Sequence, residues 1–159
     1  MKFRIGHGFD VHRLVPGRKL WLGGIQIPSV KGLSGHSDAD VLIHAICDAL
    51  LGALGEGDIG RHFPDTDESF RDIDSKLLLE NVSKIMLEKG WVIGNLDSTL
   101  IMEEPQIAPY VDDMRSVIAD ILTTDISNIS IKATTTEGLG PEGRAEGISA
   151  HAIVLIEQA

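Results

Sequence analysis

Asp10 and His12 are the first residues with clear chemical potential, two positions apart in the segment GHGFDVH at residues 6–12. Ile5 and Phe9 favour an extended strand here, and residues two apart on a strand point to the same side. A carboxylate and an imidazole are two of the three protein ligands that a catalytic zinc ion needs. Such a pair also occurs on ordinary strand surfaces, so the short motif alone is a weak signal.

His44 is the predicted third ligand, and it lies in the apolar run 41–50, which is typical of a buried helix. A lone histidine in such a helix is by default a satisfied core residue. Asp40 lies one helical turn before it, however, and a carboxylate there can hold the second ring nitrogen of a metal-binding imidazole. Two imidazoles and one carboxylate suit Zn²⁺ and leave a fourth position for substrate or water.

His36 and Ser37 come just before the predicted start of this helix. The exposed amides and the positive end of a helix favour anions, so a phosphate group bound there would be contacted by both side chains. The alternative is that Ser37 only caps the helix. The spacing does not choose between these two roles, and they are compatible.

The segment KATTTE at residues 132–137 ends a predicted strand with three hydroxyl groups and a carboxylate. Threonine by itself marks only β-propensity. Glu137, placed where a diphosphate binds, would suit Mg²⁺, which prefers one or two carboxylates together with phosphate oxygens. Arg144 adds a cation on the following glycine-rich loop, for which the alternative is a simple solvated turn.

The composition is that of a globular protein, because 43% of the 159 residues are hydrophobic and 24% are charged. We therefore expect one domain over residues 1–159. The net charge of -10 makes nucleic acid an unsuitable partner, and no apolar run reaches membrane-spanning length. Cys47 is the single cysteine, which excludes an intrachain disulfide. No signal or transit peptide fits before the first motif, so we expect a cytoplasmic protein.

Hydrophobic periodicity predicts an alternation of strands and helices. Strands are predicted at the start of the chain, in a hairpin over 20–27, and over 95–102, 129–135 and 148–156. Helices are predicted from a Ser37 or Asp38 cap to about Leu54, from an Asp74 or Ser75 cap to about Lys89, and over 109–122. The segment 57–67 is predicted to be a long loop. This order indicates an α/β (α+β) layer fold, with helices on one face of a single mixed sheet and an uncovered face that favours oligomerisation.

Five blocks of residues together resemble one enzyme family: GHGFDVH at 6–12, HSDAD at 36–40, GDIG at 57–60, FPDTD at 63–67 and KATTTE at 132–137. Over essentially its full length the chain resembles the 2-C-methyl-D-erythritol 2,4-cyclodiphosphate synthases of the non-mevalonate isoprenoid pathway. The resemblance implies a phosphorus–oxygen lyase that converts 4-diphosphocytidyl-2-C-methyl-D-erythritol 2-phosphate to the cyclic 2,4-diphosphate and CMP. It also implies a homotrimer with active sites between subunits, Zn²⁺, and a second divalent cation, Mg²⁺ or Mn²⁺.

The same resemblance assigns roles to individual residues. Asp10, His12 and His44 match the zinc ligands, Glu137 matches the ligand of the second cation, and His36 and Thr135 match the residues that position substrate and stabilise the transition state. The positions that match substrate contacts are Asp10, His12, His36, Ser37, Asp58, Ile59, Gly60, Phe63, Pro64, Asp65, Thr66, Asp67, Met102, Pro105, Gln106, Ile107, Ala108, Thr134, Thr135, Thr136, Glu137 and Arg144. Within this set, 102–108 and 134–137 match the cytidine side. The lining of a cavity on the trimer axis, where isoprenoid phosphates bind, is matched by Phe9, Gly140 and Arg144.

The chain departs from the family pattern at three positions. Pro141 follows Gly140 where an aromatic residue is usual, and this bears on the axial cavity more than on catalysis. Ala145 replaces a usual glycine. Gln106 stands where lysine is frequent, which removes a possible phosphate contact on the cytidine side. None of the three departures touches the predicted metal ligands.

Two rival functions fit parts of the pattern. The first is a zinc-dependent phosphohydrolase, in which bound water rather than a substrate phosphate attacks. The second is a trimeric binding module whose metal site is structural. Structural zinc sites usually have four protein ligands, often cysteines, whereas this chain offers three good ligands and one buried-looking cysteine, Cys47.

Overall fold

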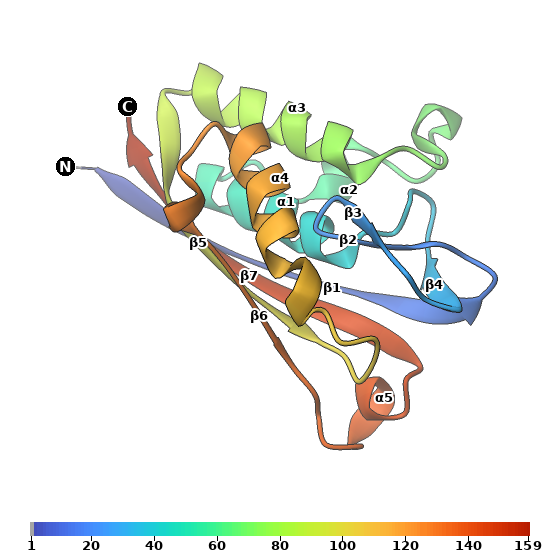
Figure 1. The fold of residues 1–159 in the computed structure, drawn as a ribbon. Coiled ribbons are helices and arrows are strands. Elements are labelled where there is room, and N and C mark those ends of the chain that lie inside the picture. The colour runs from blue at the N-terminus through green and yellow to red at the C-terminus, as the bar shows by residue number, and fades with distance from the viewer. Residues whose placement is uncertain (1) are drawn as a thin grey trace.

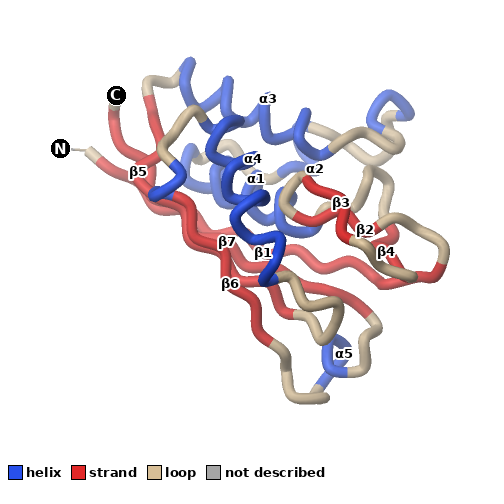
Figure 2. The backbone as a smooth tube through the Cα atoms, in the orientation of Figure 1, coloured by secondary structure: helices blue, strands red, loops and turns tan. Residues whose placement is uncertain are grey.

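A five-stranded mixed sheet forms the framework of the protein, in a computed structural model that describes residues 2–159. Its strands lie in the order β4 (Lys31–Ser34), β1 (Phe3–Pro16), β7 (Gly147–Gln158), β5 (Trp91–Ile101) and β6 (Ile129–Thr134). Neighbouring strands are antiparallel except for β5 and β6, which run parallel. The predicted hairpin forms a separate two-stranded sheet of β2 (Leu20–Leu22) and β3 (Ile25–Ile27) (Figure 2).

Three long helices cover one face of this sheet, as predicted: α1 (Val41–Leu54), α3 (Ser75–Glu88) and α4 (Val111–Leu122) (Figure 1). Each was expected from its periodicity, and α3 begins at the expected cap, where the Asp74 side chain accepts a hydrogen bond from the Lys76 amide. Short helical segments complete the described chain: α2 (Ile59–His62), α5 (Gly140–Gly143) and the 3₁₀ turns Glu68–Phe70, Ala108–Tyr110 and Ile126–Asn128. No helix among residues 2–159 has the length and apolar character required to cross a membrane.

Helix α1 packs directly on the backbone of β1, because two glycines remove the side chains that would separate them. A Cβ atom at Gly6 would lie 1.8 Å from the carbonyl oxygen of Ala49, and one at Gly8 would lie 1.8 Å from that of Ala45. Only glycine permits so close an approach. The contact brings His44, the residue before Ala45, against the part of β1 that follows Gly8.

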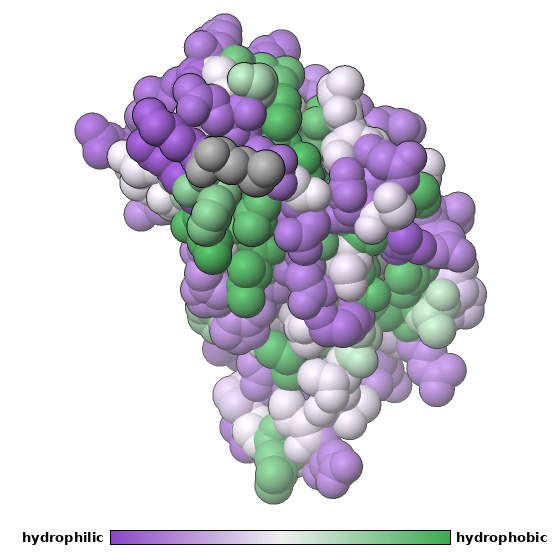
Figure 3. Space-filling view, turned by 90° about the vertical axis from the view of Figure 1, so that its left-hand side faces the viewer, coloured by the Kyte–Doolittle hydropathy of each residue, from purple (hydrophilic) through white to green (hydrophobic). Residues whose placement is uncertain are grey.

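Within residues 2–159 no helix covers the opposite face of the sheet (Figure 1). Large hydrophobic residues of β1 and β7 are about half exposed there: Phe3, Ile5, Phe9, Val11 and Ile153. Figure 3 shows hydrophobic residues exposed near the N-terminal end of the sheet and bordered by hydrophilic ones. An apolar patch of this kind is typical of a surface that another molecule covers.

The structure corrects several boundaries. Helix α1 begins at Val41 with Asp40 as its cap, and not with Ser37 or Asp38, because Ala39 has a φ of 58° and breaks the helix before that point. Strand β4 was not predicted, and α2 occupies part of the predicted loop. Strands β5 and β7 begin earlier than predicted, and β7 also ends later, because pairing with neighbouring strands extends them past the apolar residues that signal them.

Candidate active site

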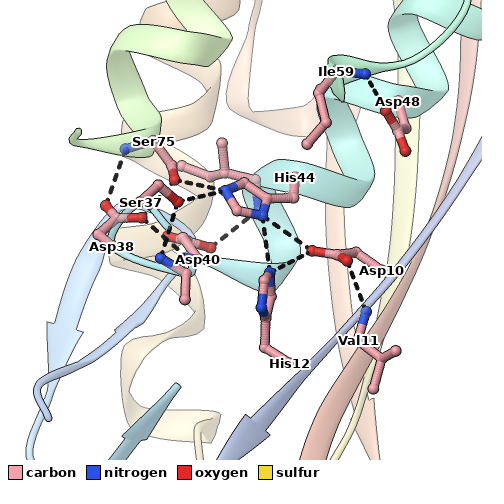
Figure 4. A network of polar contacts seen from close by, with 12 residues as sticks. Asp10, Val11, His12, Ser37, Asp38, Asp40, His44, Asp48, Ile59 and Ser75 are labelled. Carbon is pink, nitrogen blue, oxygen red and sulfur yellow. Dashed lines mark hydrogen bonds and ion pairs between the residues drawn. The ribbon is translucent and has the colours of Figure 1, made fainter. Parts of the chain in front are cut away.

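Asp10, His12 and His44 converge at one point beneath α1 (Figure 4). The Asp10 Oδ2 atom lies 2.9 Å from Nε2 of His12 and 3.0 Å from Nδ1 of His44. The two imidazole nitrogens are 3.1 Å apart. Three ligands of a tetrahedral ion with bonds of about 2.0–2.1 Å are separated by about 3.3 Å, so this triangle has the size of a zinc site. Among residues 2–159 no other cluster of three metal-ligating side chains is present.

The second nitrogen of each histidine is held by a partner that fixes the ring. Nδ1 of His12 lies 3.0 Å from the carbonyl oxygen of Ser34 and donates to it, which leaves Nε2 free for a cation. Nε2 of His44 lies 3.0 Å from the hydroxyl oxygens of both Ser37 and Ser75. The Ser75 hydroxyl in turn donates to the carboxylate of Asp38. The Ser75 hydroxyl can therefore accept a hydrogen bond from Nε2–H of His44 while it donates its own to Asp38.

The predicted partnership between Asp40 and the His44 ring is wrong. The carboxylate of Asp40 is buried and accepts from the amides of Gly23 and Gly24 at 3.0 and 2.8 Å, and from that of Ile43 at 3.1 Å. It therefore anchors the hairpin of β2 and β3 to the start of α1. A helical spacing of four brings two residues to one face, but here the carboxylate of Asp40 is bonded to backbone amides and not to the His44 ring.

Hydrogen bonding and burial oppose each other in setting the protonation of the cluster. Burial disfavours the ionised form of Asp10, but hydrogen bonds and charge from His12 and His44 outweigh it and hold the pKa of Asp10 at about 2. Burial likewise disfavours charge on His12, yet its bond to Asp10 raises the pKa of His12 above that of an ordinary imidazole. Asp10 is therefore a carboxylate at neutral pH, as a cation ligand must be.

A cavity of about 600 Å³ opens above the three side chains. It is lined by most of the residues predicted for one half of the substrate, namely Asp10, His12, His36, Ser37, Ile59, Gly60, Phe63, Pro64, Asp65 and Thr66. Two predicted residues of this half do not line it. Asp58 instead caps α2 by accepting from the Arg61 amide at 3.0 Å, and the carbonyl oxygen of Asp67 lies 3.3 Å from Nε2 of His36.

Ser37 does not cap α1, because its hydroxyl bonds the Ala39 amide at 3.1 Å and faces the His44 ring. Asp48, one turn beyond His44, accepts from the Ile59 amide at 2.8 Å and so fixes the start of α2 against α1. Each of these contacts holds part of the cavity wall in place.

A second cavity of about 400 Å³ lies where β5 and β6 end, at the sheet edge formed by β6. It is lined by the residues predicted for the cytidine side, Met102, Pro105, Gln106, Ile107, Ala108, Thr134 and Thr135, and shares no residue with the first cavity. Strand β6 is three strand positions from β1, or about 14 Å, so Thr135 and Glu137 are not brought to the Asp10 cluster within one chain. Thr136, Glu137 and Arg144 line neither cavity.

Glu103 holds the loop that carries Glu137, and the sequence analysis missed it. Its Oε1 atom accepts from the amides of Thr136 at 3.1 Å and Gly138 at 3.3 Å. Glu137 itself is exposed, with a φ of 54° that a non-glycine residue rarely adopts. Ser75 was likewise missed as a partner of His44, and Asp38 as the partner of Ser75. The sequence indicated Ser75 only as a possible helix cap. No local pattern connects it to His44, which lies 31 positions away in the chain.

The chain is similar to known proteins over almost its full length. The model of the YgbB family matches residues 3–157. Proteins named 2-C-methyl-D-erythritol 2,4-cyclodiphosphate synthase from Syntrophotalea carbinolica and Bacillus subtilis are each 60% identical over 156 residues, which is 98% of this chain and 95% and 99% of those proteins.

Two solved structures share the fold. The bifunctional IspDF from Campylobacter jejuni superposes with a TM-score of 0.96 at 40% identity, and the alignment covers 99% of this chain and 43% of that one. A Plasmodium falciparum IspF, described as a CDP complex, has a TM-score of 0.87 at 33% identity over 98% of this chain and 96% of its own.

Proposed function

This chain belongs to the YgbB family, and we propose that it converts 4-diphosphocytidyl-2-C-methyl-D-erythritol 2-phosphate to 2-C-methyl-D-erythritol 2,4-cyclodiphosphate and CMP. The single observation that carries the proposal is the triangle of Asp10, His12 and His44 at the base of a cavity large enough for a sugar phosphate. In this reaction an oxygen of the substrate's 2-phosphate bonds to the β-phosphorus. The bond from the β-phosphorus to the oxygen of CMP breaks.

The donor set of the cluster fits a zinc ion. Two neutral imidazoles and one carboxylate, with the second nitrogens of both rings already engaged, are the ligands and outer contacts that Zn²⁺ takes in catalytic sites. Asp10, His12 and His44 would hold the ion. Bound there, it would supply Lewis-acid polarisation of a phosphate oxygen and a template for the folded substrate.

The protein's own task is to position charged groups, because the nucleophile belongs to the substrate. The 2-phosphate is already ionised, so no activated serine or cysteine is needed, and burial raises the pKa of the Cys47 thiol well above its ordinary value. His36 and Ser37 would orient the methylerythritol phosphate, and residues 58–60 and 63–67 would enclose it. Holding the two phosphates in line accounts for much of the rate enhancement expected in phosphoryl transfer.

The active site would be completed by a neighbouring copy of the chain, in a homotrimer. Support comes from the separation of the two cavities, which share no lining residue and lie at strands three positions apart in the sheet. Packing copies through the uncovered sheet face would let the cytidine side of one copy meet the Asp10 cluster of the next. Thr135 would then contact the phosphates and Glu137 would bind a second divalent cation, Mg²⁺ or Mn²⁺.

The same assembly would give Phe9, Gly140 and Arg144 a shared axial cavity suited to an isoprenoid phosphate. Phe9 is half exposed on the uncovered face. Arg144 bonds Glu146 through Nε and an Nη atom at 3.2 and 3.3 Å, so a phosphate there would compete with that carboxylate. Pro141 is the second residue of α5, close to Arg144 in the chain.

Phosphorus NMR of one incubation tests the reaction. The protein is mixed with the proposed substrate, Zn²⁺ and Mg²⁺, beside a His44→Ala variant and a His62→Ala control. His62 is a suitable control because it contacts the Glu56 carbonyl and does not line the cavity. We expect CMP and cyclic diphosphate with the wild type and His62→Ala, and neither with His44→Ala. A linear bisphosphate would mean that water attacks, and full turnover by His44→Ala would refute the assigned site.

A further inference from the structure

A second pair of facing histidines lies on the uncovered face of the sheet. Nε2 of His7 in β1 and Nδ1 of His151 in β7 are 3.1 Å apart, and the two rings stack with centroids 5.4 Å apart. In the strand register Phe9 pairs with His151 and His7 pairs with Ile153, so the two imidazoles are diagonal neighbours on one face. The imidazole nitrogens at the candidate active site are separated by the same distance.

The partners of this pair differ from those of the other histidines. The rings of His12, His36 and His62 each contact a backbone carbonyl oxygen, and that of His44 contacts two hydroxyls. Within residues 2–159, the side chains of His7 and His151 make a polar contact only with each other. The two nitrogens that face one another therefore have no other polar partner in the described chain.

We propose that His7 and His151 form a second metal site, which binds a divalent transition-metal ion such as Zn²⁺, Ni²⁺ or Cu²⁺. Imidazole nitrogen is a preferred ligand of these ions. With bonds of about 2.0–2.1 Å, nitrogens at this separation subtend about 100° at a shared ion, near the tetrahedral angle. Each ring would bind the ion through the nitrogen that faces the other ring, and its second nitrogen points away from the ion.

The two rings are held in place before any ion binds. Strands β1 and β7 are paired without interruption from Phe3 to Arg13, so the backbones on both sides are fixed. The ring of Phe9 packs against that of His151 at a centroid distance of 4.8 Å. Asp97, which pairs with Ile153 across β5 and β7, forms an ion pair with Lys132 of β6. Preorganised ligands lose little conformational entropy on binding.

Two protein ligands leave further coordination positions, which either water or the same histidines of neighbouring copies would fill. The second case rests on the homotrimer proposed above. It is favoured by the surroundings of the pair, since Ile5, Phe9 and Ile153 are exposed apolar side chains on the same face. An ion shared among copies would lie within this apolar surface and link the subunits.

Counting bound cobalt tests the second site. Metal-free protein is dialysed against Co²⁺ as the wild type, His44→Ala, His151→Gln and His62→Ala. Glutamine at position 151 keeps a hydrogen-bonding partner for His7 but removes an imidazole. We expect His151→Gln to lose only the second ion, His44→Ala to lose only the ion of the candidate active site, and His62→Ala to match the wild type.

The number of ions lost in His151→Gln also reports how they are held. A loss of about one ion per chain would mean that each chain binds its own, and about one per three chains would mean that copies share it. Equal cobalt binding by the wild type and His151→Gln, or an equal loss in His62→Ala, would overturn the proposal. The count involves no turnover, so it stands whether or not the proposed reaction is correct.

Discussion

Replacing Gly8 with alanine should damage both the fold and the candidate active site. The new Cβ would lie 1.8 Å from the Ala45 carbonyl oxygen and 2.8 Å from the Ala49 amide nitrogen. Because non-bonded heavy atoms pack at about 3.5 Å, α1 would have to move from β1 by more than about 1 Å. The obstacle is backbone, which cannot rotate away, so the cost lies at the upper end of overpacking, about 3 kcal/mol.

The same displacement moves His44, which precedes Ala45 on α1. A misplacement of about 1 Å in a catalytic group costs about 10²-fold in rate. We therefore expect Gly8→Ala to lower the melting temperature by about 6–12 °C and turnover by about two orders of magnitude. Thermal unfolding followed by circular dichroism and an assay of CMP release measure the two effects.

Gly52→Ala is the matched control, because it makes the same chemical change in α1 itself. A Cβ there meets nothing nearer than the His7 carbonyl oxygen at 3.9 Å. Alanine is a better helix former than glycine, so this variant should gain about 0.5–1 kcal/mol and keep full activity. If Gly8→Ala were as stable and active as the wild type, the inferred contact between α1 and β1 would be wrong.

Three further predictions concern single contacts. Ser75→Ala removes one of the two hydroxyls at His44 Nε2 and should weaken zinc binding by about 10–100-fold without unfolding the protein. Competition with a chelator measures the zinc affinity, and an unchanged affinity would exclude Ser75 as a residue that positions His44. Asp10 raises the pKa of His12, and a metal ion needs the neutral ring. Zinc affinity should therefore fall as pH decreases through that pKa, by up to about tenfold per pH unit. Zinc titrations that show the same affinity between about pH 8 and 6 would contradict this prediction. Ala145 has a φ of 53°, so Ala145→Gly should relieve backbone strain of about 1–2 kcal/mol. Glycine also makes the unfolded chain more flexible, so the net gain in the free energy of unfolding should be about 0.5–1 kcal/mol. Denaturant unfolding measures this change, and a loss of stability would refute the strain.

Residues that act on near neighbours in the chain were well predicted. The two-residue period of a strand was enough to place Asp10 and His12 on one side of β1, and the structure brings their side chains to 2.9 Å. The helical period and the cap at Asp74 predicted α3. These features depend on backbone geometry over a few residues, so the sequence contains the information locally. His44 was predicted to join the cluster because Asp40 lies one helical turn before it; its contacts with Asp10 and His12 agree with the prediction, although Asp40 is not its partner.

Contacts that join distant segments could be decided only by the tertiary structure. The spacing of Asp40 and His44 allows their side chains to meet. In the fold, however, Asp40 accepts hydrogen bonds from the amides of Gly23 and Gly24, and the His44 ring contacts Ser37 and Ser75. The partition of the predicted substrate contacts between two cavities follows from the strand order, which places β6 three positions from β1.

The pair of His7 and His151 is the clearest case, because 144 residues separate two rings that meet at 3.1 Å. Local periodicity gives the side of a strand on which each residue lies, and nothing more. Which strands become neighbours depends on the free energy of burying the whole apolar face at once, a property of the complete chain. The sequence therefore determined which residues have chemistry to offer, and the fold decided which of them meet.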